Sequence, residues 1–226
     1  MEWRNFGNRI ARQGRSTIML DLFLSAFITF FVIIDPPGCA PIYASLTKGA
    51  TAAQRRNMAI RATAVAAGIL VVFALFGEQL LGALHIELNS FRIAGGIMLF
   101  LIATDMVFEK RTERREERAQ KIIDTPEIED VSVFPMAMPM IAGPGSIASV
   151  MLLMSQNEGI DRATVILAAL GSVLVLTLLA LMAAGPLMRV LGDKVEAVIT
   201  RLLGVLLAAL AAQFVIDGLR ASFIGA

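Results

Sequence analysis

The residues of this sequence with the most distinctive chemistry lie in two short segments rich in proline and glycine. Residues 35–41 read DPPGCAP, and residues 142–148 read AGPGSIA. Proline and glycine are poor residues for a helix interior, yet both segments lie inside long apolar runs. A helix that restarts after such a break has free N–H donors and about +0.5 of a charge at its N-terminus. Two such starts predict a site for a small anionic group such as a carboxylate.

Asp35 is the one ionisable residue near the middle of its apolar run. In the middle of a membrane a charged side chain costs about 3 kcal/mol or more, so such a residue indicates a functional site. Asp35 is expected to bind a coupling cation, take up a proton, or hydrogen-bond a substrate ammonium. It also suits the cap of the half-helix that follows, and this structural role is compatible with the others.

The other predicted substrate-binding residues belong to the same two segments. Pro41 suits the first turn of one half-helix, and Ser146 suits the N-cap of the other. The alternative is a pair of proline kinks that bind no ligand. The predicted substrate-binding set is Asp35, Pro37, Gly38, Cys39, Pro41, Gly143, Pro144, Gly145 and Ser146, and the secondary candidates are Arg92, Arg201 and Gln213.

The sequence predicts neither catalysis nor a metal site. His85 is the one histidine, so no histidine-rich cluster with metal-ligand spacing is present. Ser146 follows a glycine turn, but no histidine or lysine base lies in the same run, so no enzyme is expected. No organic cofactor is expected, and a proton or a sodium ion is the predicted coupling ion. The net charge of +1 argues against nucleic acid, which leaves the lipid bilayer, a small-molecule solute and a second copy of the chain as expected partners.

The composition is typical of a membrane protein. Of the 226 residues, 57% are hydrophobic and 17% are charged, against roughly 25% charged in soluble domains. A transmembrane helix requires about 20 mostly apolar residues. A soluble bundle is excluded because a chain of this length cannot bury helices that are apolar on every side. The apolar runs predict an all-α polytopic fold with six transmembrane helices, near residues 20–46, 60–80, 90–108, 132–155, 163–185 and 200–219.

The predicted helices divide into two halves of three. Pro37-Gly38 precedes Pro144-Gly145 by 107 residues, and RIAG at 92–95 precedes RLLG at 201–204 by 109. Because three is odd, the second half enters the membrane from the opposite side, as in the inverted repeats of secondary transporters. The sequence therefore predicts two inverted three-helix repeats whose first and fourth helices are broken. The predicted segments are an N-terminal extension (1–18) that is either disordered or an incorrectly assigned start, a first repeat (19–108), a charged linker (109–130), a second repeat (131–220) and a short tail (221–226).

The distribution of lysine and arginine predicts the orientation in the membrane. Seven of these residues fall on the side of the two termini and thirteen on the other side. Basic residues concentrate on the cytoplasmic side. Both termini are therefore expected outside, with linker 109–130 in the cytoplasm. This linker is expected to be either a solvated connection or a docking surface for a partner.

The chain resembles the MarC family of bacterial inner-membrane proteins. The resemblance lies in residues 33–47 (IIDPPGCAPIYASLT), 92–106 (RIAGGIMLFLIATDM), 135–153 (PMAMPMIAGPGSIASVMLL) and 201–219 (RLLGVLLAALAAQFVIDGL). It implies a six-span protein of the inner membrane. The name of the family refers to multiple antibiotic resistance, and some of its members are grouped with neutral amino acid transporters.

Two functions follow from these observations. The broken helices and the resemblance together predict a secondary transporter for a small amphoteric solute such as a neutral amino acid, with a midplane site formed by the two half-helix N-termini and Asp35. The alternative is a non-transporting membrane scaffold or regulatory protein that acts through linker 109–130.

Overall fold

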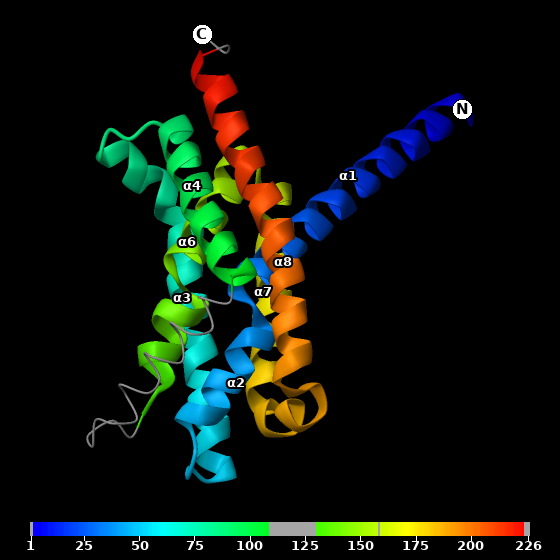
Figure 1. The fold of residues 1–226 in the computed structure, drawn as a ribbon. Coiled ribbons are helices and arrows are strands. Elements are labelled where there is room, and N and C mark those ends of the chain that lie inside the picture. Colours follow the sequence, from blue (N-terminus) through cyan, green and yellow to red (C-terminus); the bar gives the residue numbers. More distant parts are fainter. Residues whose placement is uncertain (1, 109–129, 158, 224–226) are drawn as a thin grey trace.

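The computed structural model describes residues 2–108, 130–157 and 159–223, and every regular element in these ranges is helical (Figure 1). The all-α prediction is therefore confirmed for this part of the chain. Linker 109–130 lies outside the described residues except for Asp130, and the predicted N-terminal extension falls largely within the first helix. In chain order the elements are α1 (Glu2–Ile34), α2 (Pro36–Leu46), α3 (Ala52–Ala83), α4 (Leu88–Val107), the irregular helix η1 (Ser132–Ile141), α6 (Pro144–Gln156), α7 (Ile160–Met182) and α8 (Ala184–Phe223).

Most of the helices are long and apolar enough to cross a membrane. Large apolar side chains are exposed along them, among them Val72, Phe76 and Leu101, and extended apolar surfaces of this kind suit contact with lipid. The prediction of a multi-pass protein is confirmed, with five spans, or six when η1 and α6 count as one span. The five are Thr17–Leu46, Ala52–Ala83, Leu88–Val107, Ile160–Met182 and Ala197–Phe223.

Two of these spans are interrupted at the predicted places. Asp35 separates α1 from α2, and η1 meets α6 at a bend of 53°. An additional irregularity inside η1 was not anticipated. Phe134 and Met138 have extended backbones there, because each precedes a proline and such a residue is biased away from the helical conformation.

The molecule has two opposite ends, named here by Lys48, which follows α2, and by Arg220, near the end of α8. At the Lys48 end, a capping box at Thr51 and Gln54 starts α3, and Arg55 lines a cavity together with Met182. The end of α2, the start of α3 and the end of α7 therefore meet there. At the Arg220 end, the α3–α4 hairpin lies beside the end of α8, and the C-terminus is at the top of Figure 1.

The two halves of the chain pack through equivalent pairs of helices. Helix α2 contacts α7 and α8, whereas α6 contacts α3 and α4. In the same way α1 lies along α7, and η1 lies along α3. Helices α4 and α8 pack against each other over much of their length. Most of the buried apolar residues form one core cluster around α1, α2, α3, α6 and α7, and a second cluster lies between α4 and α8.

Small residues allow α4 and α8 to approach closely. A Cβ atom at Gly96 would lie 2.9 Å from the carbonyl oxygen of Ala211, and one at Gly204 would lie 3.1 Å from that of Ala103. Each glycine therefore faces the backbone of the other helix, which is the close approach that small residues permit in membrane helices. The two contacts are related by a constant separation: Gly204 follows Gly96 by 108 positions, and Ala211 follows Ala103 by 108 positions.

Candidate functional site

The first break is centred on Asp35. The N–H of Asp35 still donates to the carbonyl of Phe31 at 2.9 Å, so α1 remains helical up to this point. Pro36 and Pro37 follow in the first turn of α2, where the missing proline N–H groups are tolerated. Asp35 has φ 59° and ψ 65°, in the left-handed region. Aspartate is one of the few residues other than glycine that adopt this region, so the sequence DPP suits a sharp restart of the helix.

The Asp35 side chain caps the new helix. Its carboxylate oxygen Oδ1 accepts a hydrogen bond from the N–H of Gly38 at 3.1 Å, and the residue is only 1% exposed. A Cβ atom at Gly38 would lie 2.2 Å from Oδ2 of Asp35. Glycine is therefore required here because the capping carboxylate occupies the space that a side chain would need. The prediction that Asp35 caps a half-helix is confirmed.

The second break has no acidic cap. Gly143 is the N-cap of α6, its backbone is extended, and no side chain accepts a bond from the first turn. A Cβ atom at Gly143 would lie 2.4 Å from the carbonyl oxygen of Pro139. This close approach of two backbone segments excludes a larger residue. Pro144 then starts α6, as Pro36 starts α2.

The same type of hydrogen bond crosses both breaks. The Cys39 thiol donates to the carbonyl of Ile34 at 3.4 Å, and the Ser146 hydroxyl donates to the carbonyl of Ile141 at 2.8 Å. Each donor reaches back five residues, to the last residue of the preceding helix. The break frees these carbonyls from their helical partners, and a buried carbonyl without a partner is costly. Cys39 and Ser146 are 107 positions apart, the separation of the two Pro-Gly pairs.

Two predicted local roles are wrong. Pro41 does not lie in the first turn of α2, since the helix begins at Pro36 and Pro41 lies inside it. The aspartate and the first two prolines already end α1 and start α2. Ser146 is not the N-cap of α6, since that position is Gly143 and the serine hydroxyl points back to Ile141.

The space beside both glycines is occupied by protein. At Gly145 a Cβ atom would lie 2.6 Å from Cδ1 of Ile102, with Ile33 and Leu99 next nearest. Gly145 and Ser146 are buried, Pro37 is half-buried and Pro144 is exposed. Three cavities of about 340, 150 and 510 Å³ are lined by residues within 43–61, 73–78, 130–131, 151–163 and 181–185, and none of these lining residues belongs to either break. The substrate-binding role of these residues remains a prediction.

The secondary candidates lie away from the two breaks. Arg92 is half-buried near the start of α4, and its Nε atom is buried without a hydrogen-bond partner among the described residues. Arg201 is exposed on α8. Gln213 is also exposed, and its side-chain amide donates to the Asp217 carboxylate at 2.7 Å. Arg92 lies on α4, and Arg201 and Gln213 lie on α8, so none of the three belongs to the half-helices α2 and α6.

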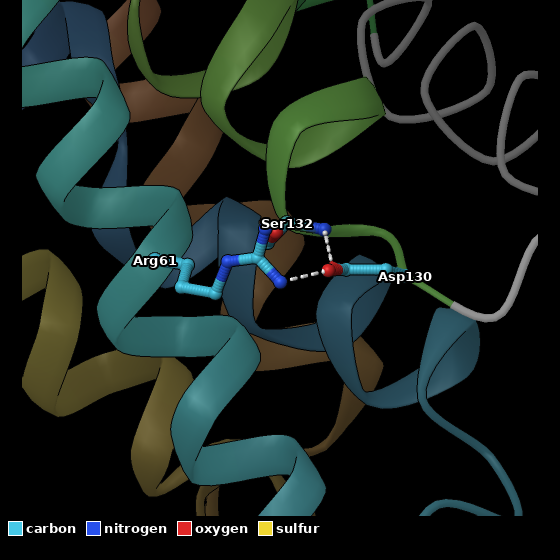
Figure 2. Close-up of polar contacts among 3 residues, drawn as sticks. All are labelled: Arg61, Asp130 and Ser132. Carbon is cyan, nitrogen blue, oxygen red and sulfur yellow. Dashed lines mark hydrogen bonds and ion pairs between the residues drawn. The ribbon is translucent and has the colours of Figure 1, made fainter.

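A polar contact at the Lys48 end was not predicted (Figure 2). Arg61 on α3 forms an ion pair with Asp130, and the N–H of Ser132 donates to the same carboxylate at 2.9 Å. The hydroxyl of Ser132 lies near the carboxylate but forms no hydrogen bond of normal geometry with the described residues. Ser132 most strongly, and Arg61 less so, hold the pKa of Asp130 below its ordinary value, against the opposing effect of burial.

This ion pair joins the start of the second half to the first half. Arg61 and Asp130 are 69 positions apart, so no local pattern in the sequence indicates the pairing. A cavity of about 510 Å³ lies beside it, and its polar lining includes Lys48, Gln54 and Asn57. The hydroxyl of Tyr43 donates nearby to the carbonyl of Arg55, which ties α2 to α3.

No group of three or more histidine, cysteine or carboxylate residues that could hold a metal is found in the described ranges. The oxygen-bearing groups at the breaks are the Asp35 carboxylate, the Ser146 hydroxyl and backbone carbonyls. In chemical terms each break offers a helix start and one polar side chain, together with the Asp35 charge at the first break.

Comparison with known proteins identifies the family. Residues 20–223 match the model of the MarC family integral membrane proteins. The UPF0056 membrane protein MJ1677 of Methanocaldococcus jannaschii is 37% identical over 209 residues, which are 91% of this chain and 99% of that protein. YvbG of Bacillus subtilis is 33% identical over 206 residues, 91% of this chain and 98% of its own. YhcE of Escherichia coli is 33% identical over 205 residues, 90% of this chain and 94% of its own.

No solved structure matches the chain. The predicted resemblance to MarC proteins is confirmed over nearly the whole described length, including both breaks and all the candidate spans except the first residues of α1. The chain is therefore a multi-pass integral membrane protein of the MarC family.

Proposed function

We propose that this protein is a secondary transporter for a small amphoteric solute such as a neutral amino acid, built as two inverted three-helix repeats. The observation that carries the proposal is the matching pair of breaks. The half-helix after each break starts with proline. The side chains of Cys39 and Ser146, which are 107 positions apart, each donate a hydrogen bond across their break to the carbonyl five residues earlier. Broken helices of this kind form solute sites in many transporters.

The reciprocal packing of helices supports the inverted repeat. The contacts of α2 with α7 and α8 correspond to those of α6 with α3 and α4. The close contacts of Gly96 and Gly204 across the α4–α8 interface are reciprocal in the same sense. A pseudo-twofold axis between α4 and α8 accounts for both observations, because such an axis exchanges the two halves of the chain.

The chemistry of the two breaks suits an amphoteric solute. The start of each half-helix favours a carboxylate, and the Asp35 carboxylate suits an ammonium group, a proton or a sodium ion. The side chains of Asp35 and Ile102 occupy the space at Gly38 and Gly145. Solute binding therefore requires these side chains to move away from the two glycines.

Transport is tested by reconstitution in liposomes. Uptake and efflux of a panel of neutral amino acids are measured with and without a proton or a sodium gradient. We expect accumulation that depends on one gradient, and we expect Asp35→Asn to transport the solute without that dependence, because asparagine keeps the cap and removes the charge. Gly38→Leu and Gly145→Leu should lose flux by more than their loss of expression.

Several results would contradict the transporter proposal. Absence of flux for every solute would favour the scaffold function, as would a cellular phenotype that depends on linker 109–130 alone. Deletion of much of that linker separates the two functions, because a transporter keeps its flux after the deletion and a scaffold loses its phenotype.

We further propose that the Lys48 end faces the cytoplasm and that both termini lie outside. Four basic side chains, Lys48, Arg55, Arg56 and Arg61, lie at or near this end, which agrees with the distribution of basic residues in membrane proteins. Single cysteines placed near Arg114 and near Arg220 should be labelled from the cytoplasm and from outside, respectively. The opposite pattern of labelling would reverse the orientation.

A further inference from the structure

Two cavities lie at opposite ends of the molecule. The Arg56 cavity, of about 150 Å³, lies between the end of α2, the start of α3 and the α7–α8 turn. The Glu78 cavity, of about 340 Å³, lies between the end of α6, the start of α7 and the last part of α3. The first is at the Lys48 end and the second is at the Arg220 end.

The linings of the two cavities correspond at a separation of 107 residues. This is the separation of the two Pro-Gly pairs and of Cys39 from Ser146. Four residues that line the Arg56 cavity lie at the end of α2 and the start of α3. The residues 107 positions later, at the end of α6 and the start of α7, line the Glu78 cavity. These pairs are Ala44 with Met151, Thr47 with Met154, Ala52 with Gly159, and Arg56 with Ala163.

The other walls correspond in the reverse direction. Residues late in α3 line the Glu78 cavity, and the residues 107 positions later, around the end of α7, line the Arg56 cavity. These pairs are Ala74 with Leu181, Leu75 with Met182, and Glu78 with Gly185. Each wall of the Arg56 cavity that comes from one half of the chain therefore corresponds to a wall of the Glu78 cavity that comes from the other half.

Each cavity also lies along one of the half-helices that start at a break. Ala44 is six residues after Gly38 on α2, and Met151 is six residues after Gly145 on α6. The charges of the two linings differ. Arg55 and Arg56 line one cavity, whereas Glu78 is the charged residue among the described residues that line the other.

We propose that the two cavities are aqueous vestibules through which an amphoteric solute reaches the breaks from opposite faces of the membrane. The proposal rests on the inverted repeat of the proposed function. An axis that exchanges the halves places equivalent cavities on opposite faces. The guanidinium groups attract the carboxylate of the solute at one face, and Glu78 attracts its ammonium group at the other.

Reaction of single cysteines with membrane-impermeant thiosulfonates tests this proposal without any solute. Cys39 is the one cysteine of the chain and is buried, so Cys39→Ser provides the background. Leu75→Cys and Met182→Cys place thiols at equivalent positions of 47% and 45% exposure. Val72→Cys and Leu179→Cys are matched controls, since they are also 107 positions apart, are 54% and 55% exposed, and line none of the three cavities.

We expect Leu75→Cys to react from one face only and Met182→Cys from the opposite face only. Both should react at least about tenfold faster than the controls, because the reactive thiolate forms in water and not in lipid. Equal rates at cavity and control positions would mean that lipid fills both cavities. Reaction of both cavity positions from the same face would also overturn the proposal.

Reagents of opposite charge test the selectivity of the two vestibules. An anionic reagent should react faster than a cationic one at Met182→Cys, and the preference should reverse at Leu75→Cys. Arg55→Gln with Arg56→Gln should remove the first preference, and Glu78→Gln the second. Unchanged preferences in these variants would exclude the charge selectivity. Labelling as expected, together with absence of flux in the natural chain, would contradict the transport proposal alone, because the labelling requires no substrate.

Discussion

The two breaks differ in how they stabilise a restarted helix inside an apolar protein. At the first, an aspartate in the left-handed region caps α2, and a glycine three residues later leaves room for its carboxylate. At the second, Gly143 has no capping side chain and lies against the carbonyl of Pro139. The second break therefore cannot accept an acidic cap. The pair of breaks therefore holds one capping carboxylate, that of Asp35 at the first break.

The largest expected effect comes from filling the two glycine positions. Gly38→Ala and Gly145→Ala should each cost about 1–3 kcal/mol through overpacking. The obstacle at the first is the Asp35 carboxylate, and at the second it is the side chain of Ile102. The double variant Gly38→Ala with Asp35→Ala should therefore lose less stability than the sum of its two single losses, and so should Gly145→Ala with Ile102→Ala.

Thermal unfolding in detergent measures these losses. The exchanged combinations, Gly38→Ala with Ile102→Ala and Gly145→Ala with Asp35→Ala, are the controls, and their losses should be additive. The same departure from additivity in the matched and the exchanged combinations would contradict the assignment of a different obstacle to each break.

An effect of similar size concerns the cap at the first break. Asp35→Ala should cost about 1 kcal/mol for the lost capping bond, with about 1–2 kcal/mol more for alanine in the left-handed region. Asp35→Asn should cost little, because asparagine accepts the same bond and tolerates this backbone. The comparison is made by thermal unfolding at a fixed pH and salt concentration. Equal losses in the two variants would mean that the charge itself, and not the cap, stabilises the break.

A smaller effect distinguishes the two bonds that cross the breaks. Ser146→Ala should cost about 1 kcal/mol, because it leaves the buried carbonyl of Ile141 without its partner. Cys39→Ala should cost less, since a thiol is a weak donor and its distance to Ile34 is longer. Cys39→Ser provides the stronger donor and should retain the stability of the natural chain. A larger loss for Cys39→Ala than for Ser146→Ala would overturn the equivalence of the two bonds.

The smallest effect lies outside the breaks, at the ion pair of Arg61 with Asp130. An exposed pair of this kind contributes less than about 1 kcal/mol. Because the pKa of Asp130 is lowered on folding, its contribution is present above the ordinary value of 3.8 and is lost as the pH falls through the lower pKa of the folded state. The stability difference between the natural chain and Asp130→Asn should therefore disappear in acid. A difference that grows as the pH falls below 4 would contradict this assignment.

Much of the architecture follows from the sequence. Apolar runs of about 20 residues determine the membrane spans, because lipid offers no partners for free backbone groups. The DPPG and GPG segments determine where two spans are interrupted, since proline lacks the donor that a continuous helix requires. The MarC resemblance was also visible in the same segments. Asp35 as a cap was predicted because aspartate is a favoured capping residue and a half-helix was expected to follow it.

Residue type alone did not determine the first turn of each half-helix. Pro41 and Ser146 both suited a helix start, but the helices begin at Pro36 and Pro144, and the Ser146 hydroxyl bonds to the carbonyl of Ile141. Tertiary contacts decided what surrounds the breaks. The obstacle beside Gly145 is Ile102, a residue of α4 that no local pattern relates to it. The sequence by itself determined where the helices are interrupted, because that depends on backbone donors within a few residues. Only the folded chain decided that Ile102 fills the space beside Gly145 and which residues line each cavity, because these contacts join residues far apart in the sequence.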